Sequence, residues 1–141
     1  MPFEDRHVFV YGTLCRGEQR DINKLNPRPE FIREAYVHGT LYDLGTYPGI
    51  VLGGQGAVRG EVYGINAELE SLLDEIEEVW PQQTGEYAKR EVQVQLKDVG
   101  NHDRDMRSMS CLIYEITASH TEGKPVIEGG DWVQYRKRQM R

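Results

Sequence analysis

Short apolar runs and segments with a two-residue period recur along this chain, and both patterns predict strands. Residues 8–11 form an apolar run that is typical of a buried strand. Between residues 92 and 96, apolar positions alternate with glutamines, which is the period of a half-buried strand. Another strand is expected over residues 110–116, where one face carries Leu112, Tyr114 and Ile116.

Two longer extended segments are expected in the first half of the chain. The first covers residues 32–44, with Gly39 as a candidate bend, and the second covers residues 57–65. The sequence Gly53-Gly54-Gln55-Gly56 lies between them, and its glycines predict a hairpin turn there.

One segment shows the helical period instead. Asn66 is the expected N-cap and Pro81 the expected stop, and the apolar stripe between them consists of Leu69, Leu72, Leu73, Ile76 and Trp80. With few helices and many strands, the chain is predicted to have an α+β fold. The expected architecture is a small curved mixed β-sheet or barrel, formed by a single domain over residues 1–141.

Composition narrows the class of protein. The chain is 38% hydrophobic and 28% charged, which is typical of a globular protein. No stretch approaches the roughly 20 apolar residues that span a membrane, and the polar N-terminus does not resemble a signal peptide. Two cysteines make no disulfide framework, so a cytoplasmic location is expected. The net charge of −6 argues against nucleic-acid binding, and the oligomeric state stays open.

The loop after the first predicted strand is a candidate binding element. Its sequence is Tyr11-Gly12-Thr13-Leu14. Glycine adopts backbone angles that other residues avoid and lets a ligand approach the main chain. The N–H groups that follow can then converge on an anion or a carbonyl oxygen. The alternative interpretation is a simple change of chain direction.

The predicted helix carries a candidate catalytic carboxylate. Six acidic residues and no basic residue lie between positions 66 and 79, which on most of the helix predicts a solvated acidic face. At about 100° per residue, Glu78 points away from the apolar stripe, whereas Glu77 lies at its edge. Partial burial and the neighbouring charges of Asp74 and Glu78 would raise the pKa of Glu77. A raised carboxylate pKa suits general acid–base catalysis near neutral pH.

Several motifs occur together in a fixed order. After the Tyr11–Leu14 loop come Tyr47-Pro48-Gly49, then Val-Arg-Gly-Glu-Val-Tyr at 58–63, then Leu-Leu-Asp-Glu-Ile-Glu at 72–77, then a Tyr-containing strand at 87–94. A weaker match lies at Gly130-Asp131-Trp132. This ordered set resembles the gamma-glutamyl cyclotransferase-like family.

The resemblance implies a fold, a reaction and site residues. It implies a small barrel-like sheet with a cavity at one end, and no cofactor or metal. Glu77 corresponds to the acid/base of the family's Leu-Asp-x-x-Glu motif, and the Tyr11, Gly12, Thr13 and Leu14 loop would hold the glutamyl end of the substrate. Tyr87 and Tyr114 either line the cavity or pack in the core. The implied partner is a small γ-glutamyl amine, which cyclises to 5-oxoproline and releases the free amine.

The resemblance leaves two points open. Family members act on γ-glutamyl amino acids, γ-glutamyl-lysine isopeptides or γ-glutamyl antibiotic intermediates, so the leaving amine is undetermined. The family's Tyr-x-Arg also differs from Tyr87-Ala88-Lys89-Arg90, where either Lys89 replaces the arginine or Arg90 is displaced to the other face. The alternative function is therefore a non-catalytic small-ligand-binding module with the same fold.

Other chemistry-bearing residues give weaker signals. Cys15 lies beside the loop, but the pattern predicts no activating base, and strand geometry gives no reason for His7 to face it. The other histidines, His38, His102 and His120, lack metal-ligand spacing. The basic residues at 136–138 and 141 are interpreted as a solvated terminus or as a partner of the acidic helix.

Overall fold

The computed structural model describes residues 6–18, 20–77, 87–97 and 108–139. Their strands are β1 (Arg6–Val10), β2 (Glu30–Asp43), β3 (Pro48–Ile65), β4 (Tyr87–Leu96) and β5 (Ser108–Ile116). Their α-helices are α1 (Ala67–Ile76) and α2 (Trp132–Gln139), and short 3-10 turns cover Ile22–Lys24 and Ala118–Thr121. Trp80 of the predicted apolar stripe and the helix stop predicted at Pro81 lie outside the described residues.

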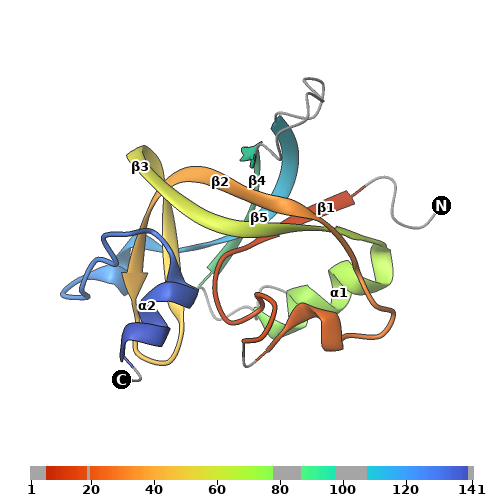
Figure 1. Cartoon of the computed structure of the whole chain (residues 1–141), viewed down its shortest axis with the longest axis horizontal. Coiled ribbons are helices and arrows are strands. Elements are labelled where there is room, and N and C mark those ends of the chain that lie inside the picture. Colours follow the sequence, from red (N-terminus) through yellow and green to blue (C-terminus); the bar gives the residue numbers. More distant parts are fainter. Residues whose placement is uncertain (1–5, 19, 78–86, 98–107, 140–141) are drawn as a thin grey trace.

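The described strands close into a barrel in the order β1-β3-β2-β4-β5 (Figure 1). All neighbouring pairs are antiparallel except the closing pair, in which β1 runs parallel to β5 and Val8 lies opposite Leu112. The prediction of a small curved mixed sheet or barrel with few helices is confirmed.

The hairpin between β2 and β3 corrects one prediction. Its turn covers residues 44–47, and Asp43 lies opposite Pro48. The Leu44 N–H donates to the Tyr47 carbonyl at 3.0 Å. Gly53 and Gly54 do have positive φ angles, 103° and 80°. They lie inside β3, where pairing steps from Gly39–Leu52 to His38–Ala57. The predicted turn is therefore a bulge in β3, opposite Gly39. The sequence did not separate the two structures because glycines with positive φ occur in bulges as well as in turns.

Side chains from the two faces of β1 enter two different hydrophobic clusters. Phe9 packs in one cluster with residues of β2 and β4 such as Val37 and Val94. Val8 and Val10 pack in the other cluster with Leu69 and Leu73 of α1. Since successive strand residues point to opposite faces, β1 supports both the barrel interior and the helix that covers its outside.

Helix α1 begins where the sequence predicts. The side chain of Asn66 accepts a hydrogen bond from the Leu69 N–H at 2.9 Å, which makes it the N-cap. Glu77 is the C-cap residue. The apolar stripe at Leu69 and Leu73 is fully buried, so packing fixes which edge of the helix faces the barrel.

The basic segment near the C-terminus is only in part a solvated terminus. Its residues 136–138 lie in α2, where Lys137 and Arg138 are exposed, and Arg141 lies outside the described residues. The helix begins at Trp132, whose side chain is 2% exposed. Arg136 forms an ion pair with Glu18 at 3.6 Å, and the Trp132 indole N–H donates to the same carboxylate at 3.1 Å. The C-terminal helix therefore holds the loop after β1.

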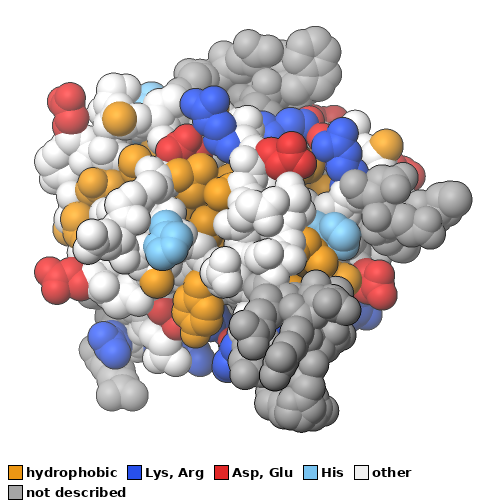
Figure 2. All heavy atoms as spheres, turned by 90° about the horizontal axis from the view of Figure 1, so that it is seen from above, with side chains coloured by type: hydrophobic (Ala, Val, Ile, Leu, Met, Phe, Trp, Pro, Cys, Tyr) orange, Lys and Arg blue, Asp and Glu red, His pale blue; other side chains and the backbone are white. Residues whose placement is uncertain are grey.

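The surface has mixed character. Figure 2 shows a face on which hydrophobic side chains gather centrally while basic and acidic side chains lie beside one another at its border. Ion pairs such as Arg59–Glu34 at 2.8 Å and Lys97–Glu34 at 3.2 Å join opposite charges across strands. Among the described residues, neither helix is long and apolar enough to cross a membrane.

Candidate active site

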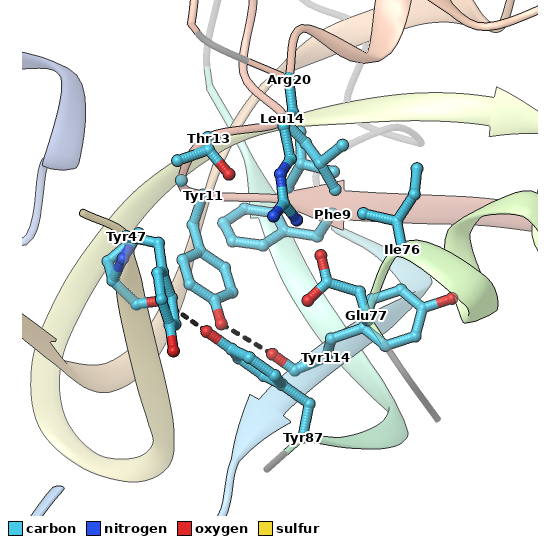
Figure 3. A pocket seen from close by; sticks show the side chains of 13 residues that line it. Phe9, Tyr11, Thr13, Leu14, Arg20, Tyr47, Ile76, Glu77, Tyr87 and Tyr114 are labelled. Atoms are coloured by element: carbon cyan, nitrogen blue, oxygen red, sulfur yellow. Dashed lines mark hydrogen bonds between the residues drawn. The ribbon is translucent and has the colours of Figure 1, made fainter. Parts of the chain in front are cut away.

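A pocket of about 240 Å³ lies where β1 runs into its loop (Figure 3). Every site residue predicted from the sequence lines it, although these positions do not by themselves test the assigned roles. Those residues are Tyr11, Gly12, Thr13, Leu14, Glu77, Tyr87 and Tyr114. The structure thus brings together a loop and a helix edge that are more than 60 residues apart in sequence.

The backbone of the loop is oriented by its carbonyl groups. Gly12 C=O accepts from the Cys15 N–H at 3.0 Å, Thr13 C=O from Arg20 at 2.8 Å, and Leu14 C=O from Ile22 at 2.8 Å. In a planar trans peptide, the following N–H points opposite to the carbonyl. The Thr13 and Leu14 N–H groups therefore point away from the loop body, and these residues border the pocket.

These amide groups are available to a ligand. In the described part of the chain, no protein acceptor is paired with the N–H of Gly12, Thr13 or Leu14. Adjacent backbone donors without an acceptor form a concave site for a carboxylate or a developing oxyanion. We call the Gly12–Leu14 backbone the amide cradle.

Gly12 is needed for a different reason than the sequence suggests. Its φ angle is not positive, unlike that of Gly17 at 83° in the same loop. A Cβ at position 12 would lie 2.6 Å from Cγ of Pro48, which also lines the pocket. The glycine therefore permits a close approach between the cradle and the β2–β3 hairpin.

A buried carboxylate that the sequence analysis did not single out holds the loop against the barrel. Glu61 of β3 is 7% exposed and accepts from the Arg16 N–H and from the Tyr63 hydroxyl, both at 2.9 Å. Asp21 accepts from the Gly17 N–H at 2.8 Å. Glu61 lies in the Gly-Glu-Val-Tyr segment, and an acidic residue in a buried strand was the available signal.

The carboxylate of Asp74 fixes the rotation of helix α1. It is buried, and it accepts from the Tyr114 hydroxyl at 2.7 Å and from Lys89 Nζ at 3.0 Å. Lys89 also contacts Glu70 at 2.7 Å. Burial lowers the pKa of Lys89, but the hydrogen bonds to Glu70 and Asp74 outweigh this and raise it. Glu77 follows Asp74 by almost one turn, so the same anchor directs it to the pocket.

The departure from the family's Tyr-x-Arg motif has a structural explanation. Lys89 shares a face with Tyr87 and contacts Glu70 and Asp74 of α1. Arg90 lies on the other face of β4 and pairs with Glu115 at 3.1 Å. Lys89 therefore faces α1 on the side of Tyr87, whereas Arg90 faces away from it.

The tyrosines both line the pocket and brace its walls. The Tyr11 hydroxyl donates to the Tyr114 carbonyl at 2.7 Å and accepts from the Ile50 N–H at 3.3 Å. The Tyr87 hydroxyl donates to the Pro48 carbonyl at 2.8 Å. Burial, and then the charge of Glu77, raise the pKa of Tyr11 well above its ordinary value. At neutral pH the Tyr11 phenol is therefore a neutral donor.

Because several tyrosine side chains are buried, the stability of the folded protein is expected to depend on pH. Burial is the first cause that raises the pKa of Tyr11, Tyr63 and Tyr114 above the ordinary value of about 10. A raised folded-state pKa contributes stability that is present below pH ~10 and is lost as the pH rises further. We expect the midpoint of denaturant unfolding to fall above pH 10. An absorbance titration at 295 nm should show part of the tyrosines ionising only on unfolding, and full ionisation of the folded protein near pH 10 would contradict this.

Cys15 is unsuited to nucleophilic catalysis. Its side chain is 1% exposed and its Sγ contacts the Val10 carbonyl at 3.5 Å. Burial, followed by the negative charge of Glu61, raises the pKa of the thiol well above its usual range. Since the thiolate is the reactive form, Cys15 serves packing. Among the described residues, no group of His, Cys, Asp or Glu side chains could hold a metal ion.

Sequence reasoning missed several pocket residues. Phe9, Tyr47 and Ile76 supply apolar walls, and Arg20 supplies a cation (Figure 3). Nothing in the spacing of Arg20 distinguishes it from Arg16 nearby, because a loop has no periodicity from which a facing direction can be read.

Comparison with solved structures identifies the class of fold. An AIG2-like protein from Mus musculus superposes with a TM-score of 0.69 at 26% identity, over 87% of this chain and 86% of that one. A family model described as "Gamma-glutamyl cyclotransferase, AIG2-like" matches residues 8–134, and the chain belongs to this family.

Two relatives carry the name "Putative gamma-glutamylcyclotransferase". The protein from Vibrio cholerae is 39% identical over 80 aligned residues, and the match covers 51% of this chain and 62% of the relative. The protein from Halalkalibacterium halodurans is 32% identical over 105 aligned residues, and the match covers 73% of this chain and 86% of the relative. The match to the Vibrio protein thus spans less than two thirds of that protein.

Proposed function

We propose that this protein is a gamma-glutamyl cyclotransferase-type lyase. It would convert a γ-glutamyl amine into 5-oxoproline and the free amine, with Glu77 as general acid/base and without a cofactor. The observation that carries the proposal is the pairing of two groups at one pocket. The amides of the cradle, which have no acceptor among the described residues, form one wall, and the Glu77 carboxylate lies at another.

The reaction needs few protein groups because both reactants belong to one molecule. The α-amino nitrogen of the substrate attacks its own γ-carbonyl carbon, a new C–N bond closes the five-membered ring, and the C–N bond to the leaving amine breaks. Holding the chain folded supplies much of the rate acceleration, since no second reactant must be captured. The pocket is of a size that suits a small folded substrate.

Glu77 and the amide cradle have separate roles in this reaction. Glu77 transfers the protons, and the cradle stabilises the negative charge. Glu77 takes a proton from the α-ammonium group so that nitrogen can attack, and later returns a proton to the leaving nitrogen. As nitrogen adds, negative charge develops on the γ-carbonyl oxygen. The Thr13 and Leu14 N–H groups are donors for that oxyanion. No water is consumed, so the products balance the substrate.

The test is incubation with a panel of γ-glutamyl amines. γ-Glutamyl methylamide, γ-glutamyl-alanine and Nε-γ-glutamyl-lysine share the reacting end and differ in the amine released. We expect 5-oxoproline and the amine in equal amounts from at least one, measured by chromatography and mass spectrometry. Saturable binding of these compounds without release of 5-oxoproline from any would instead support the non-catalytic binding module.

A further inference from the structure

One cation lines the pocket in the described part of the chain, and it lies across from Glu77. Arg20 approaches from the loop side with its guanidinium group directed into the pocket, and the Glu77 carboxylate points into the same space (Figure 3). Among the described residues, no carboxylate forms an ion pair with the Arg20 side chain. A positive and a negative group thus face the same ligand space.

The backbone of Arg20 is held on both sides. Its N–H donates to the Thr13 carbonyl at 2.8 Å, which places its Cα beside the amide cradle. Before it, Glu18 is fixed by the Trp132 indole N–H at 3.1 Å. After it, Asp21 accepts from the Gly17 N–H at 2.8 Å. A cation carried by a braced loop loses less conformational freedom when it binds a ligand.

We propose that Arg20 is a specificity-determining residue that pairs with the α-carboxylate of the γ-glutamyl substrate. The inference rests on the proposed function, in which Glu77 must contact the α-ammonium group. The α-carboxylate is bonded to the same carbon as that ammonium. A zwitterionic amino-acid head therefore presents two opposite charges to a pocket with the complementary pair, Glu77 for the ammonium and Arg20 for the carboxylate.

This assignment defines a substrate class. Substrates must carry both a free α-amino group and a free α-carboxylate on the glutamyl unit, whereas the released amine can vary. A glutamyl residue whose α-carboxyl is an amide, as inside a peptide chain, lacks the anion that Arg20 would bind. The guanidinium group forms charge-assisted and frequently bidentate bonds with carboxylates, which gives geometric as well as charge selection.

The experiment compares paired substrates in the wild type and in Arg20→Gln. γ-Glutamyl methylamide is matched with its α-carboxamide analogue, and γ-glutamyl-alanine adds a carboxylate on the leaving side. We expect Arg20→Gln to lower kcat/KM for the two α-carboxylate substrates by about 10- to 100-fold, mostly through KM, as for loss of a charged hydrogen bond. The rate for the α-carboxamide should not change. Arg20→Lys should recover part of the lost kcat/KM, because lysine retains the positive charge but cannot form the two parallel hydrogen bonds of a guanidinium group.

A matched control and a binding measurement separate the possible failures. Arg16→Gln makes the same change in the same loop, but the Arg16 guanidinium lies 4.5 Å from the Phe31 ring centroid, and Arg16 is not among the residues that line the pocket. Arg16→Gln should leave the preference for α-carboxylate over α-carboxamide substrates unchanged. Calorimetry should show tighter binding of 5-oxoproline than of 5-oxoprolinamide in the wild type and equal binding in Arg20→Gln.

Each outcome has a distinct meaning. Turnover with an unchanged preference for the α-carboxylate in Arg20→Gln would overturn the inference and leave the proposed function standing. A loss confined to γ-glutamyl-alanine would assign Arg20 to the leaving amine and also overturn it. If no substrate is turned over, the proposed function fails, and the calorimetric comparison still decides whether Arg20 selects the carboxylate.

Discussion

Replacing Glu77 with glutamine should lower the rate of 5-oxoproline release by about 10²–10⁴-fold, the usual contribution of a general acid–base group. Glutamine retains the size of the side chain but neither accepts the ammonium proton nor returns one to the leaving nitrogen. Steady-state kinetics on the best substrate of the panel measures the effect. Since the lost interaction belongs to the transition state, kcat should fall far more than KM changes.

Glu75→Gln is the matched control for this experiment. It removes one negative charge from the same helix, but Glu75 is exposed and is not among the residues that line the pocket. Its activity should stay within a few-fold of the wild type. Full activity in Glu77→Gln would contradict the proposed mechanism, in which Glu77 is the general acid/base.

Much of the fold could be predicted because it follows from local periodicity. The alternation at 92–96 and 110–116 lies within β4 and β5, and Asn66 caps the expected helix. The hairpin turn was predicted at the wrong place because the positive φ angles of Gly53 and Gly54 are compatible with a bulge as well as with a turn. Local sequence gives the backbone angles that glycine allows, but strand pairing decides between these structures.

The predicted site residues meet at one pocket, but the contacts that position them were not visible in the sequence. The sequence presented Asp74 as an acid of the helix, a charge near Glu77 and a member of the 72–77 motif. It did not show that Tyr114 and Lys89 make Asp74 a buried anchor for α1. Arg20 and Glu61 depend on how a loop folds back on the barrel. Such long-range contacts have no period along the chain, so they become apparent only once the barrel closes.

Gly12→Ala is expected to affect both activity and stability. The added methyl group would lie 2.6 Å from Cγ of Pro48, a ring that cannot rotate away as a flexible side chain could. Either the cradle or the β2–β3 hairpin must shift, and both border the pocket. Overpacking of this kind costs about 1–3 kcal/mol of stability. A displacement near 1 Å of an oxyanion donor can cost about 10²-fold in rate.

The control for Gly12→Ala lies five residues further along. Gly17→Ala also adds a methyl group to the loop, but nothing lies within 4 Å of that Cβ, and the substitution strains only a φ angle of 83°. Thermal unfolding and kcat/KM should therefore separate the two variants. Both lose stability, whereas only Gly12→Ala should lose most of its activity at a temperature where both are folded. If folded Gly12→Ala kept wild-type kcat, the prediction would be wrong, because the hairpin would then yield to the added methyl group and the close approach of Gly12 to Pro48 would not be needed for activity.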